Sequence, residues 1–138
     1  MMQNENINLN EKALSDYYYG YLTFENFWGQ DLKKVILTHS LGTAVVLLDD
    51  KKELGPVADK EILTDVLGFK YLIGATTDYW HITFWTQTGS VYESSLGFSC
   101  NITAKDQGKA TLGINGESER MYVSFPSSSS CSTAIHIR

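Results

Sequence analysis

A strict period-two alternation in one segment limits what this chain can fold into more than any other feature. The segment is "TDYWHITFWTQTG", residues 77–89. Side chains along a strand point alternately to its two faces. One face here is wholly apolar and the other mixes rings with hydrogen-bonding groups; the two sets are Trp80, Ile82 and Phe84, and Tyr79, His81, Thr83 and Trp85. The alternation predicts a β-strand whose apolar face lies in a core.

Short turn signals divide the rest of the chain into further strands. They are "WGQD" at 28–31, "QTGS" at 87–90, "KDQGK" at 105–109 and "NGES" at 115–118. Asn-Gly, in the last of them, is the strongest short hairpin signal. The segment 62–75 is expected to form two short strands because Gly68 interrupts it, and "CNITA" at 100–104 is expected to form another.

These signals favour an all-β fold. Tyr, Phe and Trp number 8, 6 and 3, and the chain holds 2 prolines, a composition that favours sheet over helix. No segment has the sustained apolar stripe of a long helix. We therefore predict a single antiparallel β-sandwich of about eight or nine short strands over residues 17–138. Residues 1–16 are predicted to form a flexible or short helical polar leader.

Charge and hydropathy argue against binding to nucleic acid and against a membrane-spanning segment. The formal net charge is −5, and no basic cluster exceeds two adjacent lysines, so nucleic acid has no electrostatic footprint to bind. The polar start "MMQNENINLNEKALS" lacks the apolar region of a signal peptide. No window approaches the roughly 18 apolar residues of a transmembrane segment. The sequence predicts a protein that is cytoplasmic as synthesised, with release by a non-classical route as the alternative.

The two cysteines, Cys100 and Cys131, do not have the C-x-x-C spacing of a redox or zinc motif. In a cytosolic chain they are expected to be two buried or half-buried thiols. In a chain released to an oxidising compartment they would pair as a disulfide. The sequence leaves these two alternatives open.

The stretch "THSLG" around Ser40 is similar to the nucleophile turn of α/β-hydrolases. Triad partners exist in the order serine, aspartate, histidine: the acid would be Asp65 or Asp78 and the base His81 or His136. A nucleophile turn also needs a following helix and an upstream oxyanion loop. Neither is indicated here, so we interpret Ser40 as part of a strand that ends in a turn and expect no enzyme.

Metal and cofactor motifs are also missing from the sequence. There is no glycine-rich phosphate loop, and no pair of histidines has H-x-H or H-x-x-x-H spacing. We therefore expect no metal and no cofactor.

The mixed face of the aromatic strand is the candidate binding surface. Tyr and Trp supply large apolar contact at low entropic cost, each with one polar group. Tyr79, His81 and Trp85 share this face, and Trp28 in the "FWGQD" turn is expected to extend it. An alternative interpretation is that a loop or a second subunit covers the face, so the chain would be a monomer or a homodimer. His81 would make binding depend on pH, since an unperturbed histidine titrates near pH ~6.5.

Two stretches resemble small all-β families. "YLTFENFWGQDLKKVILTHSLG" is similar to the start of aegerolysins, and this resemblance implies a single-domain, acidic, aromatic-rich sandwich that binds lipid, in some cases as a toxin component. "DYWHITFWTQTGSVYESS", with "CNITAKDQG" and "SSSSCSTAI", resembles a bacterial and nematode family of small stress-linked β-domains of unknown function.

The sequence thus supports three hypotheses. The first is a non-catalytic recognition domain that binds a membrane lipid, a glycan or a cell-surface target, with Trp28, Tyr79, His81 and Trp85 as its contact residues. The second is a small acidic module of the immunity or inhibitor type that binds a protein partner. The third is the Ser40 hydrolase.

Overall fold

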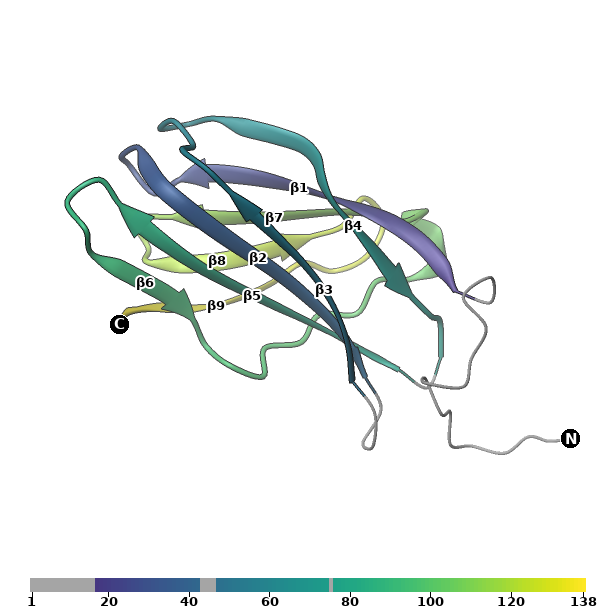
Figure 1. The fold of residues 1–138 in the computed structure, drawn as a ribbon. Helices are drawn as coiled ribbons and strands as arrows, with labels where there is room; N and C mark the ends of the chain where they lie inside the picture. Colours follow the sequence, from purple (N-terminus) through teal and green to yellow (C-terminus); the bar gives the residue numbers. More distant parts are fainter. Residues whose placement is uncertain (1–16, 43–46, 75) are drawn as a thin grey trace, which may run out of the picture.

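The computed structural model describes residues 17–42, 47–74 and 76–138, and it is built almost entirely of β-strands (Figure 1). The predicted leader at residues 1–16 lies outside the described residues. The elements, in chain order, are β1 (Tyr18–Phe27), β2 (Leu32–Gly42), β3 (Leu47–Leu54), β4 (Ile62–Tyr71), β5 (Thr77–Thr86), β6 (Val91–Ser94), the short 3-10 helix η2 (Ala104–Asp106), β7 (Lys109–Asn115), β8 (Arg120–Ser124) and β9 (Cys131–Ile137). The predicted all-β fold is confirmed.

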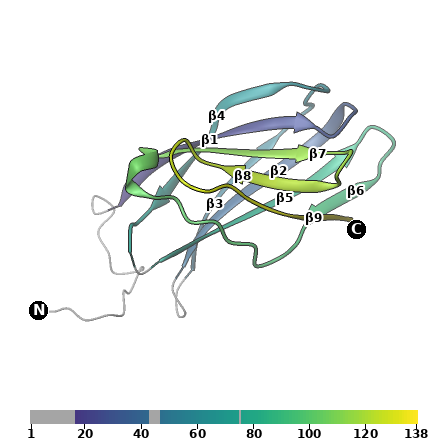
Figure 2. The ribbon, with the colours of Figure 1, turned by 180° about the vertical axis from the view of Figure 1, so that it is seen from behind.

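The nine strands form one continuous sheet in the order β3-β2-β5-β6-β9-β8-β7-β1-β4. This sheet folds over into two layers, and Figure 2 shows β7, β8 and β9 in front of β2, β3 and β5. Strand β9 joins the layers because it pairs with β6 on one side and with β8 on the other. At the opposite end, Lys70 of β4 reaches Asp50 of β3 at 2.8 Å, so the two outermost strands approach each other and the sheet nearly closes.

The prediction of a purely antiparallel sandwich was wrong at one place. Strands β1 and β7 run parallel, with Tyr21 beside Lys109 and Phe27 beside Asn115. A parallel pair needs a long connection between its strands, and five strands of the sheet lie between these two in the sequence. Turn signals report only neighbouring strands, so they could not indicate this pairing.

Two local predictions were also wrong. Strand β4 runs through Gly68 as a single strand rather than breaking there. Gly68 pairs with Tyr21, whose ring lies over it in ordinary van der Waals range, 3.7 Å from the position of a Cβ atom. The segment "CNITA" forms no strand. Beside it Tyr79 and Ser99 form an isolated bridge, and the backbone N–H of Cys100 donates to the carbonyl of Asp78 at 3.0 Å.

The core lies between the two layers and is dense in aromatic rings. The predicted inward face of β5 is confirmed, because Trp80, Ile82 and Phe84 are at most 1% exposed. Trp80 packs edge-on against Phe69 of β4, with ring centroids 5.3 Å apart. The indole N–H of Trp80 donates to the carbonyl of Cys100 at 2.8 Å, so its polar atom is satisfied inside the core.

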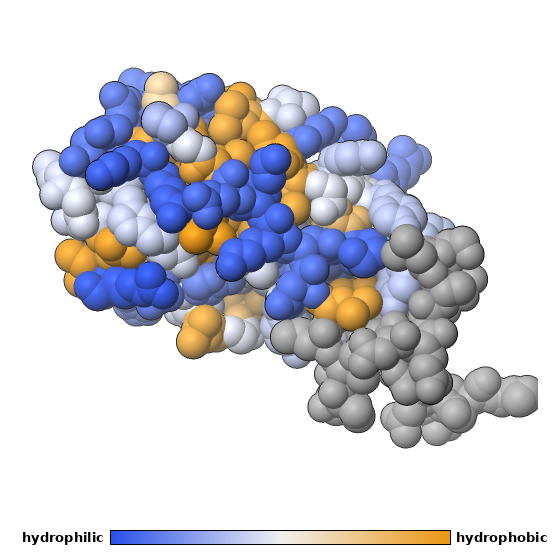
Figure 3. All heavy atoms as spheres, in the orientation of Figure 1, coloured by the Kyte–Doolittle hydropathy of each residue, from blue (hydrophilic) through white to orange (hydrophobic). Residues whose placement is uncertain are grey.

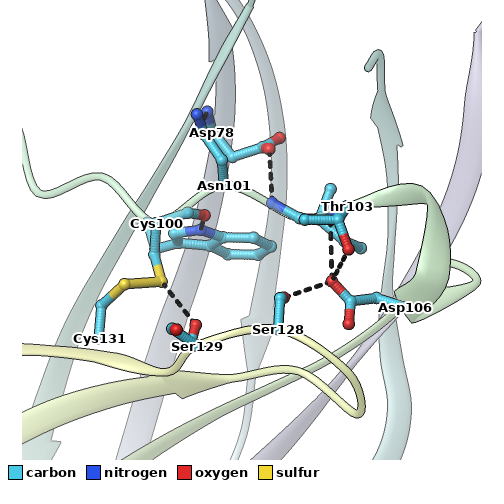
Figure 4. The surroundings of a disulfide bond; sticks show 10 residues. Asp78, Cys100, Asn101, Thr103, Asp106, Ser128, Ser129 and Cys131 are labelled. Atoms are coloured by element: carbon cyan, nitrogen blue, oxygen red, sulfur yellow. Dashed lines mark hydrogen bonds between the residues drawn. A yellow bond between two sulfur atoms is a disulfide. The ribbon is translucent and has the colours of Figure 1, made fainter. Parts of the chain in front are cut away.

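A disulfide joins Cys100 to Cys131, which settles the choice that the sequence left open (Figure 4). Beside it, the buried carboxylate of Asp106 accepts hydrogen bonds from the backbone N–H groups of Thr103 and Ser127 and from the hydroxyls of Thr103 and Ser128. Burial opposes ionisation of Asp106, but these hydrogen bonds outweigh it and lower its pKa. The bond and the carboxylate together fix the serine-rich loop before β9.

No helix within the described ranges is long and apolar enough to cross a membrane. Over the part of the chain that the structure describes, no group of three or more His, Cys, Asp or Glu side chains is placed to hold a metal ion. The face seen in Figure 3 is largely hydrophilic, with apolar patches between the polar side chains.

Candidate functional site

The outer face of β5 is flanked by polar residues of β2. In this antiparallel pair Ser40 lies opposite Tyr79, Thr38 opposite His81, and Lys34 opposite Trp85. On this face Thr83 is buried, whereas Tyr79, His81 and Trp85 are half-buried. The hydroxyl groups of β2 therefore lie beside the rings of β5, as the register of the two strands requires.

A pocket of about 430 Å³ opens on this face. Its lining residues come from β2, β5 and the loop after β6; they are Thr38, Ser40, Tyr79, Trp80, His81, Leu96 and Gly97. The volume lies within the roughly 300–1,000 Å³ of small-molecule sites. Leu96 at the rim is 83% exposed, the largest exposure among the described large apolar side chains.

Two of the four predicted contact residues, Tyr79 and His81, meet in this pocket. Trp85 is on the same face of β5 but outside the pocket, where the ammonium of Lys34 lies 4.7 Å from its ring centroid. Trp28 lies elsewhere: it packs against Phe84 and Tyr92, with centroids 5.0 Å away in each case. Because Phe84 belongs to the inner face of β5, the structure does not bring Trp28 to the predicted surface.

His81 presents a buried nitrogen without a hydrogen bond. Its Nε2 atom has no hydrogen-bond partner among the described residues, and the nearest charged atom, Oε1 of Glu93, is 3.6 Å away. Burial lowers the pKa of His81, and the attraction of Glu93 only partly offsets it. His81 is therefore neutral at neutral pH, and its buried Nε2 atom keeps an unused hydrogen-bonding capacity in the wall of the pocket.

Ser40 has the surroundings of a strand residue. It lies within β2, and its hydroxyl donates to Oδ1 of Asp49 at 2.7 Å. Of the proposed bases, His81 faces Glu93 and His136 lies 3.4 Å from the hydroxyl of Ser95. In the described chain no histidine accepts a hydrogen bond from Ser40.

A buried ionic cluster around His39 was missed by the sequence reasoning. His39 is fully buried, and its Nε2 atom lies 2.7 Å from Oδ1 of Asp78, which is also buried. Its Nδ1 atom lies 3.6 Å from Oδ2 of Asp50, a distance too long for a hydrogen bond but short enough for an ion pair. Asp50 in turn pairs with Lys70 across the gap between β3 and β4.

The cluster favours the charged forms of His39 and Asp50. Burial disfavours a protonated His39, but Asp50 and Asp78 outweigh it and raise the pKa of His39 above its ordinary value. Burial likewise opposes ionisation of Asp50, but His39 and Lys70 outweigh it and lower the pKa of Asp50 to about 2. The one sequence signal was the placement of His39 at an inward position of β2, since a buried histidine needs partners.

The fold and the pocket define a small β-sandwich with an open, amphipathic pocket on the outer face of β5. No protein-family model matches the sequence, and a search of curated proteins finds no match to it.

Proposed function

We propose that the protein is a non-catalytic recognition domain that binds a membrane lipid at the pocket around Tyr79 and His81. The observation that carries the proposal is the composition of the pocket, which combines apolar side chains with hydrogen-bonding ones. Leu96 and the rings of Tyr79 and Trp80 supply apolar surface, and the hydroxyl-bearing residues Thr38 and Ser40 supply polar groups. An amphipathic ligand matches both parts, whereas a fully polar or fully apolar ligand matches one.

The exposure of Leu96 supports insertion into an apolar phase. Fully burying a leucine side chain is worth about 1.5–3 kcal/mol, and Leu96 is 83% exposed. Tyr79 beside it has a ring with one hydroxyl, a combination favoured at membrane interfaces. The net charge of −5 repels anionic surfaces, so the matching surface is zwitterionic or neutral.

The disulfide supports a location outside the reducing cytosol, since such bonds persist in oxidising compartments. This observation favours the alternative that the protein is released after synthesis. A role as a lipid-binding toxin component, as the aegerolysin resemblance implies, fits the same compartment.

Vesicle flotation tests the proposal. Wild-type protein is expected to float with vesicles of phosphatidylcholine, with or without sphingomyelin or sterol, and Leu96→Ser is expected to reduce the bound fraction at least ~5-fold, because a loss of about 1 kcal/mol or more of apolar burial has that effect. The matched control is Ile62→Ser on β4, an aliphatic side chain that is 51% exposed and outside the pocket. Equal binding by both variants, or no flotation with any of these vesicles, would contradict the proposal.

The acidic protein-binding module is the competing function, and the same samples distinguish it. Its association would be independent of lipid and would weaken as salt rises, because screening acts on exposed charges. Retention of a basic protein partner at low salt, without flotation, would favour it.

A further inference from the structure

A second groove crosses the outer face of the other layer, where Figure 2 shows β1, β7 and β8 side by side. Its volume is about 260 Å³, just below the roughly 300 Å³ at which drug-sized sites begin, so it suits one small ring. The polar residues that line it, together with the ring of Tyr21, are Thr23, Asp65, Lys109, Thr111 and Ser124. It shares no residue with the pocket around Tyr79 and His81.

One wall of the groove is an exposed aromatic ring. Tyr21 is 53% exposed, and its ring leans toward Gly68 of the neighbouring strand. A half-exposed ring on the middle of a sheet face, rather than at its edge, offers an apolar surface for stacking.

A polar side chain of the groove comes from Asp65, a residue with a strained backbone. Strand β4 bulges beside β1, because four residue steps on β4, from Leu67 to Leu63, face two steps on β1. Asp65 sits inside this bulge with a positive φ of 55°, and its backbone N–H donates to the hydroxyl of Thr23 at 3.2 Å. Bulges re-aim side chains near functional sites, and strain of this kind concentrates at such sites.

The charged groups of the groove are unpaired. Neither Asp65 nor Lys109 forms an ion pair with any described residue, although both line the same groove. The hydroxyl-bearing residues Thr23, Thr111 and Ser124 line the groove with them. A carboxylate accepts two hydrogen bonds, an ammonium donates three, and each hydroxyl can do both.

We propose that this groove is a saccharide-binding subsite. The apolar C–H face of a sugar ring would stack on Tyr21, two neighbouring sugar hydroxyls would donate to Asp65, and Lys109 would donate to a third sugar oxygen. The set of hydroxyl, carboxylate and ammonium groups around one exposed ring matches a ligand that is rich in hydroxyl groups and has one apolar face. The proposal is independent of lipid binding at the other pocket.

Saturation-transfer-difference NMR on the folded protein tests the proposal. The probes are methyl α-mannoside, methyl β-galactoside and methyl β-N-acetylglucosaminide, with phosphocholine as a non-saccharide probe. Asp65→Asn is the sharpest variant, because asparagine tolerates a positive φ as well as aspartate does while losing the charged acceptor. Tyr21→Phe keeps the ring, and Tyr79→Phe in the other pocket serves as the matched control.

We expect saturation transfer to at least one glycoside. Asp65→Asn is expected to lower the affinity for that glycoside at least ~10-fold, since a charged hydrogen bond is worth about 1.5–3 kcal/mol. Tyr21→Phe and Tyr79→Phe are expected to retain binding, and Tyr21→Ala to lose it. The proposal is overturned if no glycoside binds, if Asp65→Asn binds as wild type does, or if phosphocholine alone binds. Circular dichroism of each variant confirms that a lost signal reflects a lost contact.

Discussion

The Nε2 atom of His39 lies 2.7 Å from Oδ1 of Asp78, beneath the place where the two outermost strands of the sheet meet. Both side chains are at most 2% exposed. A buried charge pair of this kind tolerates the loss of neither partner, because the remaining charge would lie uncompensated in the core. The pair therefore makes the stability of the fold depend on pH.

Raising the pH is expected to destabilise the protein through His39. Its pKa is higher in the folded state than the ordinary 6.5, so its stabilisation is fully present below about pH 6.5 and is lost as pH rises through the folded pKa. His39→Gln is expected to cost about 3–5 kcal/mol at low pH and less at high pH. Urea unfolding over roughly pH 6 to 9 measures this difference. His136→Gln, at an exposed position, is the control, and a constant difference between wild type and His39→Gln would contradict the prediction.

Lowering the pH is expected to act through Asp50. Its pKa falls from 3.8 to about 2 on folding, so its contribution is present above about pH 4 and is lost as pH falls toward 2. After allowance for solvent screening the contribution is at most about 2 kcal/mol. Asp50→Asn should therefore lower the free energy of unfolding at neutral pH. The difference in unfolding free energy between this variant and wild type should become smaller in acid. Asp49→Asn, next in sequence, provides the comparison, and parallel acid titrations of Asp50→Asn and wild type would count against this role.

Removing the disulfide is expected to cost about 3–4 kcal/mol, the loop-closure entropy of a bond across a sequence separation of 31 residues. Unfolding of the Cys100→Ser/Cys131→Ser variant, compared with wild type before and after reduction, measures this loss. Reduced wild type should match the double variant. Identical midpoints for oxidised and reduced wild type would show that the bond contributes nothing.

The ring of Tyr122 fills the space that a side chain at Gly113 would occupy, and its hydroxyl donates to Glu25 at 2.9 Å. Gly113→Ala is therefore expected to cost about 1–3 kcal/mol. The same substitution in a Tyr122→Ala background should cost much less, because the obstructing ring is gone. A double-mutant cycle by urea unfolding measures the coupling between positions 113 and 122. Additive losses of unfolding free energy in the two variants would contradict the prediction. Gly116→Ala should cost more than Gly113→Ala, since its Cβ would meet the backbone carbonyl of Trp28 rather than a side chain.

If lipid binds at the pocket, its affinity should change on acidification rather than near neutral pH. Burial lowers the pKa of His81 below its ordinary 6.5, so His81 stays neutral from about pH 7 upward and gains its charge only in acid. Wild-type flotation should be flat above neutrality and change in acid, and His81→Gln should remove that change. A midpoint at or above pH ~6.5 in wild type would be inconsistent with this burial.

Features set by neighbouring residues were predictable from the sequence. The alternation in β5 and the hairpin turns at 87–90 and 115–118 form as expected, because both depend on local chemistry. Residues 28–31 separate β1 from β2 as expected, although these two strands do not pair. Tyr79 and His81 could be assigned to one face for the same reason.

Features set by distant residues were not predictable. The parallel pairing of β1 with β7, the partners of His39 and the hydrogen bonds of Asp106 all join segments far apart in the chain. Gly68 was misjudged because the residue that compensates for it, Tyr21, lies on another strand. A single sequence contains no signal for such pairings.

The place of β9 also sets an order for folding during synthesis. Of the nine described strands it is the last to leave the ribosome, yet it alone joins the two layers through β6 and β8. Until it emerges, β6 and β8 each present an unpaired edge that another nascent chain could bind. A delay in the docking of β9 is therefore expected to prolong the aggregation-prone interval, even though it leaves the finished protein unchanged.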